Sequence, residues 1–75
     1  MKVQVECCAG SRADEEPRVV VLGDRRLHVL GIARRWQDVD ARYFQVRLED
    51  GDRYVLRHDE RSDEWSLVEV ARASS

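Results

Sequence analysis

The segment RYFQVRLEDGDRYVLRH, residues 42–58, decides the fold, because it predicts a β-hairpin. Apolar and polar side chains alternate on both sides of a central EDGD. The apolar ones are Phe44, Val46 and Leu48 before it and Tyr54 and Leu56 after it. Neighbouring side chains of a strand point to opposite faces, so this alternation indicates two half-buried strands.

The length of the loop sets which side chains share a face. A two-residue loop would pair Phe44 with Arg57 and mix apolar and charged side chains on each face. A three-residue loop over residues 49–51 pairs Phe44 with Leu56 and sorts the two faces. It also puts Gly51 where such a loop needs a left-handed residue. Because a slip of one residue would turn every side chain over, we predict the three-residue loop.

The second face of the predicted hairpin is rich in arginine. Its members are Tyr43, Gln45, Arg47, Arg53, Val55 and Arg57. The loop puts Arg47 opposite Arg53, and like charges in that position cost stability. This cost favours an acidic partner on the face. The alternative is that Glu49, Asp52 or carboxylates of another strand neutralise it.

Period-two alternation continues elsewhere and predicts four more strands. They cover residues 2–7 (KVQVEC), 17–22 (PRVVVL), 27–36 (LHVLGIARRW) and 64–70 (EWSLVEV). The third of these contains Gly31, and a glycine inside a strand often marks a bulge. The apolar parity changes there, from Leu27 and Val29 to Leu30, Ile32 and Trp36. We therefore expect the long strand to bend at Gly31 and to serve two halves of a curled sheet.

These elements predict one all-β domain over residues 1–75, with residues 71–75 as a frayed tail. About six antiparallel strands, joined mostly as a meander, would curl into a small SH3-like barrel or a strongly bent sheet. The bend at Gly31 favours the barrel, and an OB-like barrel is the alternative fold. No stretch carries a helical apolar stripe, although one helical turn is compatible with Ser11 and Asp14.

Composition limits the classes of function. The chain has 75 residues, 43% hydrophobic and 37% charged, which is typical of a globular domain with a charged surface. Its 15 acidic and 13 basic residues argue against a strong non-specific nucleic-acid binder. All basic residues except Lys2 are arginines, which suit paired recognition of carboxylate or phosphate but also follow from a GC-rich genome. No signal peptide or membrane span is evident, so we expect a soluble, cytoplasmic protein without membrane contact.

The sequence contains no motif that is typical of a metal site or of a catalytic site. His28, His58, Cys7 and Cys8 lack the paired spacing of a structural zinc site, so we expect no metal and no cofactor. Cys8, His58 and Asp59 are candidates for a catalytic triad, but any three polar residues could lie close together in so small a domain, and the sequence has no phosphate loop or nucleophile elbow. We therefore expect no enzyme and no catalytic residue. On a strand, Cys7 would face the core and Cys8 would be more exposed.

The aromatic residues fall into two groups. Phe44, Tyr54 and Trp65 lie on apolar parities and are expected in the core. Trp36 follows two arginines, and two positions are open to it. It either closes one end of the barrel or stands partly exposed beside Arg34 and Arg35, in a composition typical of stacking and hot-spot sites.

Three segments together carry a resemblance to a known family. They are ECCAGSRADEEPRVV (6–20), LGDRRLHV (22–29) and RYFQVRLEDGDRYVLRHDE (42–60). From about Val3 to Val70 the chain resembles a family of small uncharacterised bacterial domains. The family has no established activity, so the resemblance implies no catalytic residue. Related domains at the C-terminal end of longer proteins, some related to translesion polymerases, imply a link to DNA repair. Cys8 departs from the pattern, which usually has an aromatic residue there.

The sequence thus predicts a non-enzymatic interaction module for a protein or peptide partner. A nucleic-acid-binding accessory domain is the alternative, and a small enzyme is a third. The binding residues that we expect are Arg34, Trp36, Tyr43, Arg47, Arg53 and Arg57. An exposed sheet edge is another binding mode, and we expect a monomer or a weak homodimer. The long loop near Ser11–Glu16 would be either functional or a structural plug.

Overall fold

The computed structural model describes residues 1–7 and 16–72 and contains the six predicted strands. They are β1 (Lys2–Cys7), β2 (Pro17–Leu22), β3 (Arg25–Gln37), β4 (Ala41–Leu48), β5 (Arg53–Asp59) and β6 (Glu64–Ala71). The described ranges contain no helix. Cys8, the turn expected near Ser11 and Asp14, and most of the first long loop lie outside the described residues.

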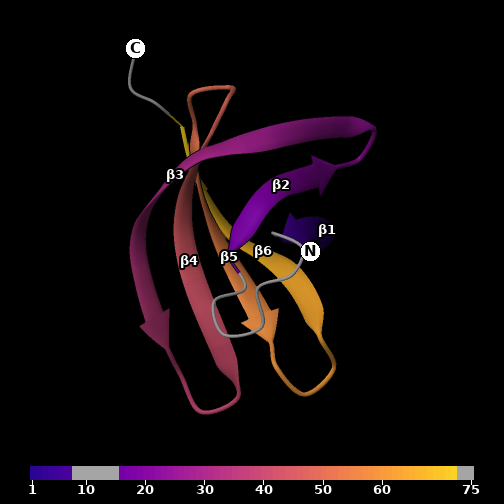
Figure 1. Ribbon diagram of the computed structural model, residues 1–75, viewed down its shortest axis with the longest axis vertical. Helices are drawn as coiled ribbons and strands as arrows, with labels where there is room; N and C mark the ends of the chain where they lie inside the picture. The colour runs from indigo at the N-terminus through magenta and orange to yellow at the C-terminus, as the bar shows by residue number, and fades with distance from the viewer. Residues whose placement is uncertain (8–15, 73–75) are drawn as a thin grey trace.

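The strands form a closed antiparallel barrel in the order β1-β2-β3-β4-β5-β6 (Figure 1). Each strand pairs with the next one along the chain, and β1 closes the barrel on β6 through Lys2–Ser66 and Val3–Trp65. This order confirms the predicted meander curled into a small barrel. The OB-like alternative would need a Greek-key order, which does not form.

The β4–β5 hairpin has the register that the three-residue loop predicts. Phe44 pairs with Leu56, and three further pairs extend the ladder on each side. The loop closes through a hydrogen bond from Gly51 N to Leu48 O at 2.9 Å. Gly51 has a φ of 92°, the left-handed conformation expected of it. The sorting of apolar and charged faces therefore predicted the loop correctly.

β3 bends and serves two halves of the barrel, as predicted. Figure 1 shows it crossing the top of the barrel beside β2 and then descending beside β4. Its first residues pair with β2 and the rest with β4. The register against β4 shifts between Val29 and Gly31, and again between Ile32 and Arg34.

The second shift corrects one expectation. A single parity change would keep Leu30, Ile32 and Trp36 on the inner side. Instead Leu30 is the extra residue of the first bulge and is 61% exposed, while only Ile32 packs against the core. The second bulge reverses the parity once more, so Trp36 lies outside and is 42% exposed.

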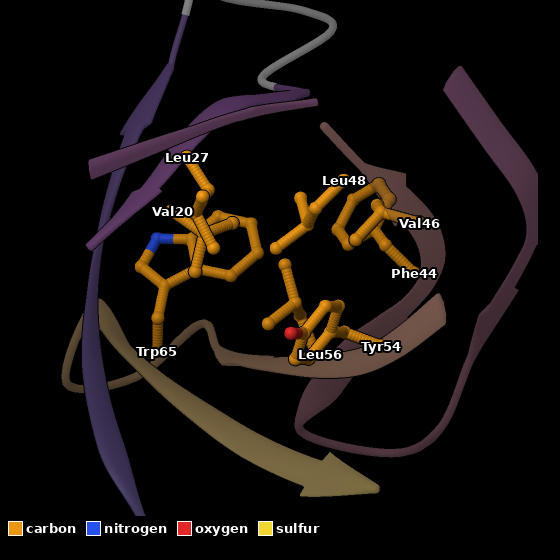
Figure 2. Packing of buried hydrophobic residues seen from close by; sticks show 8 residues of the cluster. All are labelled: Val20, Leu27, Phe44, Val46, Leu48, Tyr54, Leu56 and Trp65. Atoms are coloured by element: carbon orange, nitrogen blue, oxygen red, sulfur yellow. The ribbon is translucent and has the colours of Figure 1, made fainter. Parts of the chain in front are cut away.

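The core fills the barrel with side chains of both halves (Figure 2). Its buried members are Val20, Leu27, Phe44, Val46, Leu48, Tyr54, Leu56 and Trp65. The predicted core positions of Phe44, Tyr54 and Trp65 are confirmed, and Cys7 packs against the cluster. A side chain of this kind contributes roughly 1.5–3 kcal/mol when it is fully buried. Ala71, which the sequence places in the tail, pairs with Arg53 as the last residue of β6.

Candidate functional site

The register gathers all six predicted binding residues on one outer surface of β3, β4 and β5. We call this surface the arginine face and define it by Arg34, Trp36, Tyr43, Arg47, Arg53 and Arg57. Three cross-strand rows build it. They are Trp36–Tyr43–Arg57, Arg34–Gln45–Val55 and Gly31–Arg47–Arg53. The buried side chains between these rows point the opposite way, because neighbouring residues of a strand alternate between faces.

Two aromatic rings form the centre of the first row. The rings of Trp36 and Tyr43 stack with centroids 5.4 Å apart and an angle of 1° between their planes. The Arg34 guanidinium lies over the Trp36 ring, 5.6 Å from its centroid. Trp36 therefore does not close the barrel end, and the alternative that left it partly exposed beside Arg34 holds. The faces of the Trp36 and Tyr43 rings thus make contacts within the chain itself: the two rings contact each other, and Arg34 lies over Trp36.

Arg57 completes this row on β5. The Tyr43 hydroxyl, by hydrogen bonding, and then nearby Asp59 raise the pKa of the Arg57 guanidinium. Asp59 lies 3.5 Å from it and two residues further along the strand. The row thus presents a guanidinium group paired with a carboxylate, next to two stacked rings.

Arg47 and Arg53 lie directly opposite each other in the third row. Opposed residues of an antiparallel pair have Cβ atoms roughly 4.5–5.5 Å apart. Both arginines are exposed. Gly31 flanks the pair on β3 and Ala71 flanks it on β6, so the row ends in two residues too small to cover it.

The carboxylates of the hairpin loop point elsewhere. Glu49 Oε2 accepts a hydrogen bond from the backbone N–H of His28 at 2.6 Å. Asp50 Oδ2 accepts one from the Tyr54 hydroxyl at 2.6 Å. Within residues 1–7 and 16–72, no ion pair includes Arg47 or Arg53. Neutralisation of the face by Glu49, one of the alternatives from the sequence, therefore does not occur.

Basic residues outside the arginine face are mostly paired. The pairs are Lys2–Glu64, Arg26–Glu6, Arg35–Glu16, Arg42–Glu60 and Arg61–Asp40. Surface pairs of this kind contribute little stability each. They do neutralise charge locally, however. The overall charge of −2 therefore hides an excess of positive charge on one surface.

The contacts of His58 indicate a role in packing and in the β5–β6 turn. It is buried and stacks on Trp65 with ring centroids 4.4 Å apart. Its Nε2 lies 2.7 Å from Asp63 Oδ1. Asp63 has a φ of 57°, so this contact holds a left-handed residue in the β5–β6 turn. Cys8 lies outside the described residues, so the structure gives no distances for the triad of Cys8, His58 and Asp59.

A hollow runs along β1 and has a volume of about 760 Å³. Charged side chains at its wall have partners: Lys2 pairs with Glu64, and Glu6 pairs with Arg26. Hydrogen bonds from Arg26 lower the pKa of Glu6, and those from Lys2 lower the pKa of Glu64. Among the described residues that line it, none is a serine, cysteine or histidine. No described group of three or more His, Cys, Asp or Glu residues is placed to hold a metal ion.

Comparisons with known proteins do not assign the chain to a family. No protein-family model, curated protein or solved structure matches it. The resemblance to small bacterial domains stays a prediction. Over the residues that the structure describes, no helix is long and apolar enough to cross a membrane.

Sequence reasoning missed two features of the arginine face. One is the stacking of Trp36 on Tyr43, which depends on the second bulge of β3 and so on the extra residue Ala33. The other is the position of Gly31 and Ala71 beside the arginine pair. In the sequence, the only signal for a bulge is the break in the apolar alternation along GIARRW, residues 31–36. This break does not show how many bulges occur.

Proposed function

We propose that this protein is a non-enzymatic interaction module that binds an acidic segment of a protein partner on the arginine face. One observation carries the proposal. The face collects four arginines, and three of them, Arg34, Arg47 and Arg53, form no ion pair with any residue that the structure describes. Arginine presents a planar fork of donors that pairs bidentately with carboxylates.

The aromatic stack suits a peptide better than a nucleobase. Stacking on a base needs a free ring face. The faces of Trp36 and Tyr43 contact each other, and Arg34 covers Trp36. These contacts occupy ring faces that a base would need, while the edge of an aromatic ring carries partial positive charge. Ring edges and guanidinium groups together favour carboxylates.

Binding of this kind is steered by charge and anchored at the rings. Complementary charge raises the rate of encounter, while a buried aromatic or arginine anchor supplies most of the binding energy. Trp36 at 42% exposure retains apolar surface that a partner can cover. We therefore expect an acidic segment that also carries apolar side chains.

The test is the affinity of a fluorescently labelled, glutamate-rich peptide, measured by anisotropy. Wild-type protein should bind it, and Arg57→Ala should weaken binding about tenfold, the equivalent of one charge-assisted hydrogen bond. Arg18→Ala is the matched control. Arg18 is an exposed strand arginine on β2, outside the face, and its loss should change nothing. Equal effects of both variants, or no binding, would contradict the proposal.

A second pair of variants separates the aromatic contribution from charge. Trp36→Ala should weaken peptide binding, since the anchor is lost. Leu30→Ala removes another exposed apolar residue of β3, which lies next to Gly31 but is in none of the three rows, and should leave the affinity unchanged. If Leu30→Ala is as damaging as Trp36→Ala, binding lies around the first bulge of β3 and not on the arginine face.

A nucleic-acid accessory function is the alternative, favoured by the same unpaired arginines. Oligo(dT) in the same assay discriminates the two. Nucleic-acid binding should be tighter than peptide binding at equal charge and should weaken steeply and linearly on a log–log salt plot. A preference for the peptide at matched charge supports the protein partner.

A further inference from the structure

We propose that the Arg47–Arg53 pair binds a phosphoryl group, so that the arginine face selects a phosphorylated acidic peptide. This inference rests on the proposed function, because the same face holds the peptide. Two arginines directly opposite each other in neighbouring strands repel one another. Neither has a carboxylate partner within the described ranges. An external anion would compensate this repulsion.

The row that holds this pair is open at both ends. Gly31 lies beside Arg47, and no heavy atom lies within 4 Å of the position that a Cβ would take there. Ala71 lies beside Arg53 and is exposed. A group with oxygens on several sides can therefore reach both guanidinium groups without displacing a side chain.

Charge selects the kind of anion. Two guanidinium groups carry two positive charges, and one carboxylate neutralises only one of them. A phosphoserine, phosphothreonine or phosphotyrosine carries roughly −1.5 to −2 at pH 7 and three acceptor oxygens. A phosphodiester in a nucleic acid carries a single charge. The pair therefore matches a phosphomonoester on a peptide better than a nucleic-acid backbone.

The spacing of the rows gives the bound peptide a pattern. Arg47 and Tyr43 are four residues apart on β4, which is roughly 14 Å in an extended strand. An extended peptide along β4 that places its phosphoryl group at the arginine pair then brings the residue four positions away to the Trp36–Tyr43–Arg57 row. We expect an acidic residue at that fourth position, next to Arg57.

The test compares three peptides that differ at one residue, with phosphoserine, serine or glutamate at that position and an acidic residue four positions away. Phosphoserine should bind at least about tenfold tighter than glutamate. Arg53→Ala should remove this preference, and Arg18→Ala should keep it. Inorganic phosphate at the same concentration should compete only weakly, which distinguishes a peptide-borne group from the free ion.

Two substitutions at Gly31 sharpen the test without touching an arginine. Gly31 is not among the glycines with positive φ, so a side chain fits its backbone. Gly31→Glu puts a carboxylate next to Arg47 and should remove the phosphoserine preference. Gly31→Gln has the same size without the charge and should retain it. Retained dispersion of the amide NMR spectrum shows that each variant is folded.

The outcomes separate the two proposals. If phosphoserine and glutamate peptides bind equally and both lose affinity in Arg57→Ala, the phosphoryl inference is wrong and the acidic-peptide function stands. If none of the three peptides binds, the proposed function fails as well. If the phosphoserine preference persists in both Arg53→Ala and Gly31→Glu, the phosphoryl group is bound elsewhere and the inference is overturned.

Discussion

At the scale of single residues, the notable feature is a like-charge conflict that no ion pair resolves within residues 1–7 and 16–72. Arg47 opposes Arg53 on an exposed ladder, flanked by Gly31 and Ala71. A sequence under selection for stability alone would place an acid at one of these positions. Binding surfaces commonly retain such local costs, because the partner provides the compensation.

Replacing one arginine of the Arg47–Arg53 pair should relieve the repulsion between them. Arg53→Gln removes the like-charge opposition and should raise the free energy of unfolding by about 0.2–1 kcal/mol at low salt. Urea denaturation measures the change, and added salt should reduce it, because screening weakens the repulsion. Arg18→Gln serves as control and should be neutral. A loss of stability in Arg53→Gln would show that an internal partner already compensates the charge.

Alternation predicted which residues are buried, and the exceptions have a physical cause. Phe44, Tyr54 and Trp65 were placed in the core from parity alone, and all three are buried. Trp36 could not be placed, because parity carries no information beyond a bulge. Each bulge residue reverses the face of everything that follows it. The two bulges of β3, and with them the face on which Trp36 lies, can therefore be seen only in the pairing of β3 with β4.

At the scale of elements, the β4–β5 hairpin is the unit that positions the arginine face. Its loop joins two strands whose inner apolar residues are all buried and whose outer residues form two of the three positions in each row. The three-residue loop was predictable because only one register sorts the faces. Binding residues on this hairpin therefore depend on Gly51.

Gly51→Ala tests this dependence. Gly51 has a φ of 92°, and no heavy atom lies within 4 Å of the position that a Cβ would take, so the cost comes from backbone strain and not from a clash. We expect a loss of about 1–2 kcal/mol in the free energy of unfolding, by thermal or urea denaturation. Gly51→Asn should cost less, because asparagine tolerates the left-handed region. Equal losses would point to another cause.

The same hairpin carries a pH dependence. Burial, and then the hydrogen bond to Asp50, raises the pKa of Tyr54 to about 12, from 10.0 in the unfolded chain. A raised pKa in the folded state means that the unfolded state loses its proton first. The stabilisation is therefore fully present below pH 10 and disappears as pH rises from about 10 to about 12.

Unfolding experiments across that range check the sign. The free energy of unfolding of the wild type should fall between pH 10 and about 12, and Tyr54→Phe should remove this part of the fall. Tyr43→Phe is the control for general alkaline effects and should retain it. Tyrosinate absorbance of the Tyr43→Phe variant gives the pKa of Tyr54 directly. A Tyr54 that titrates near pH 10.0 in the folded protein would contradict this assignment.

At the scale of the whole molecule, charge is distributed unevenly over a closed barrel. Five ion pairs neutralise basic residues outside the arginine face, whereas three of the four arginines of the face form no ion pair with a described residue. Barrel closure was predictable from strand order and the bend at Gly31. The charge distribution was not, because ion pairs such as Arg26–Glu6 join residues far apart in the sequence and depend on the completed register.

The most direct test of the arginine face as the binding surface is a chemical-shift map of the labelled protein with the glutamate-rich peptide. The experiment follows the chemical shifts of the arginine Nε–H groups and of the two tryptophan indole N–H groups. We predict that the largest changes occur at Arg34, Trp36, Arg47, Arg53 and Arg57, while Arg18, Arg26 and Trp65 stay near their free positions. Changes confined to the hollow along β1, or equal changes at every arginine, would contradict this prediction.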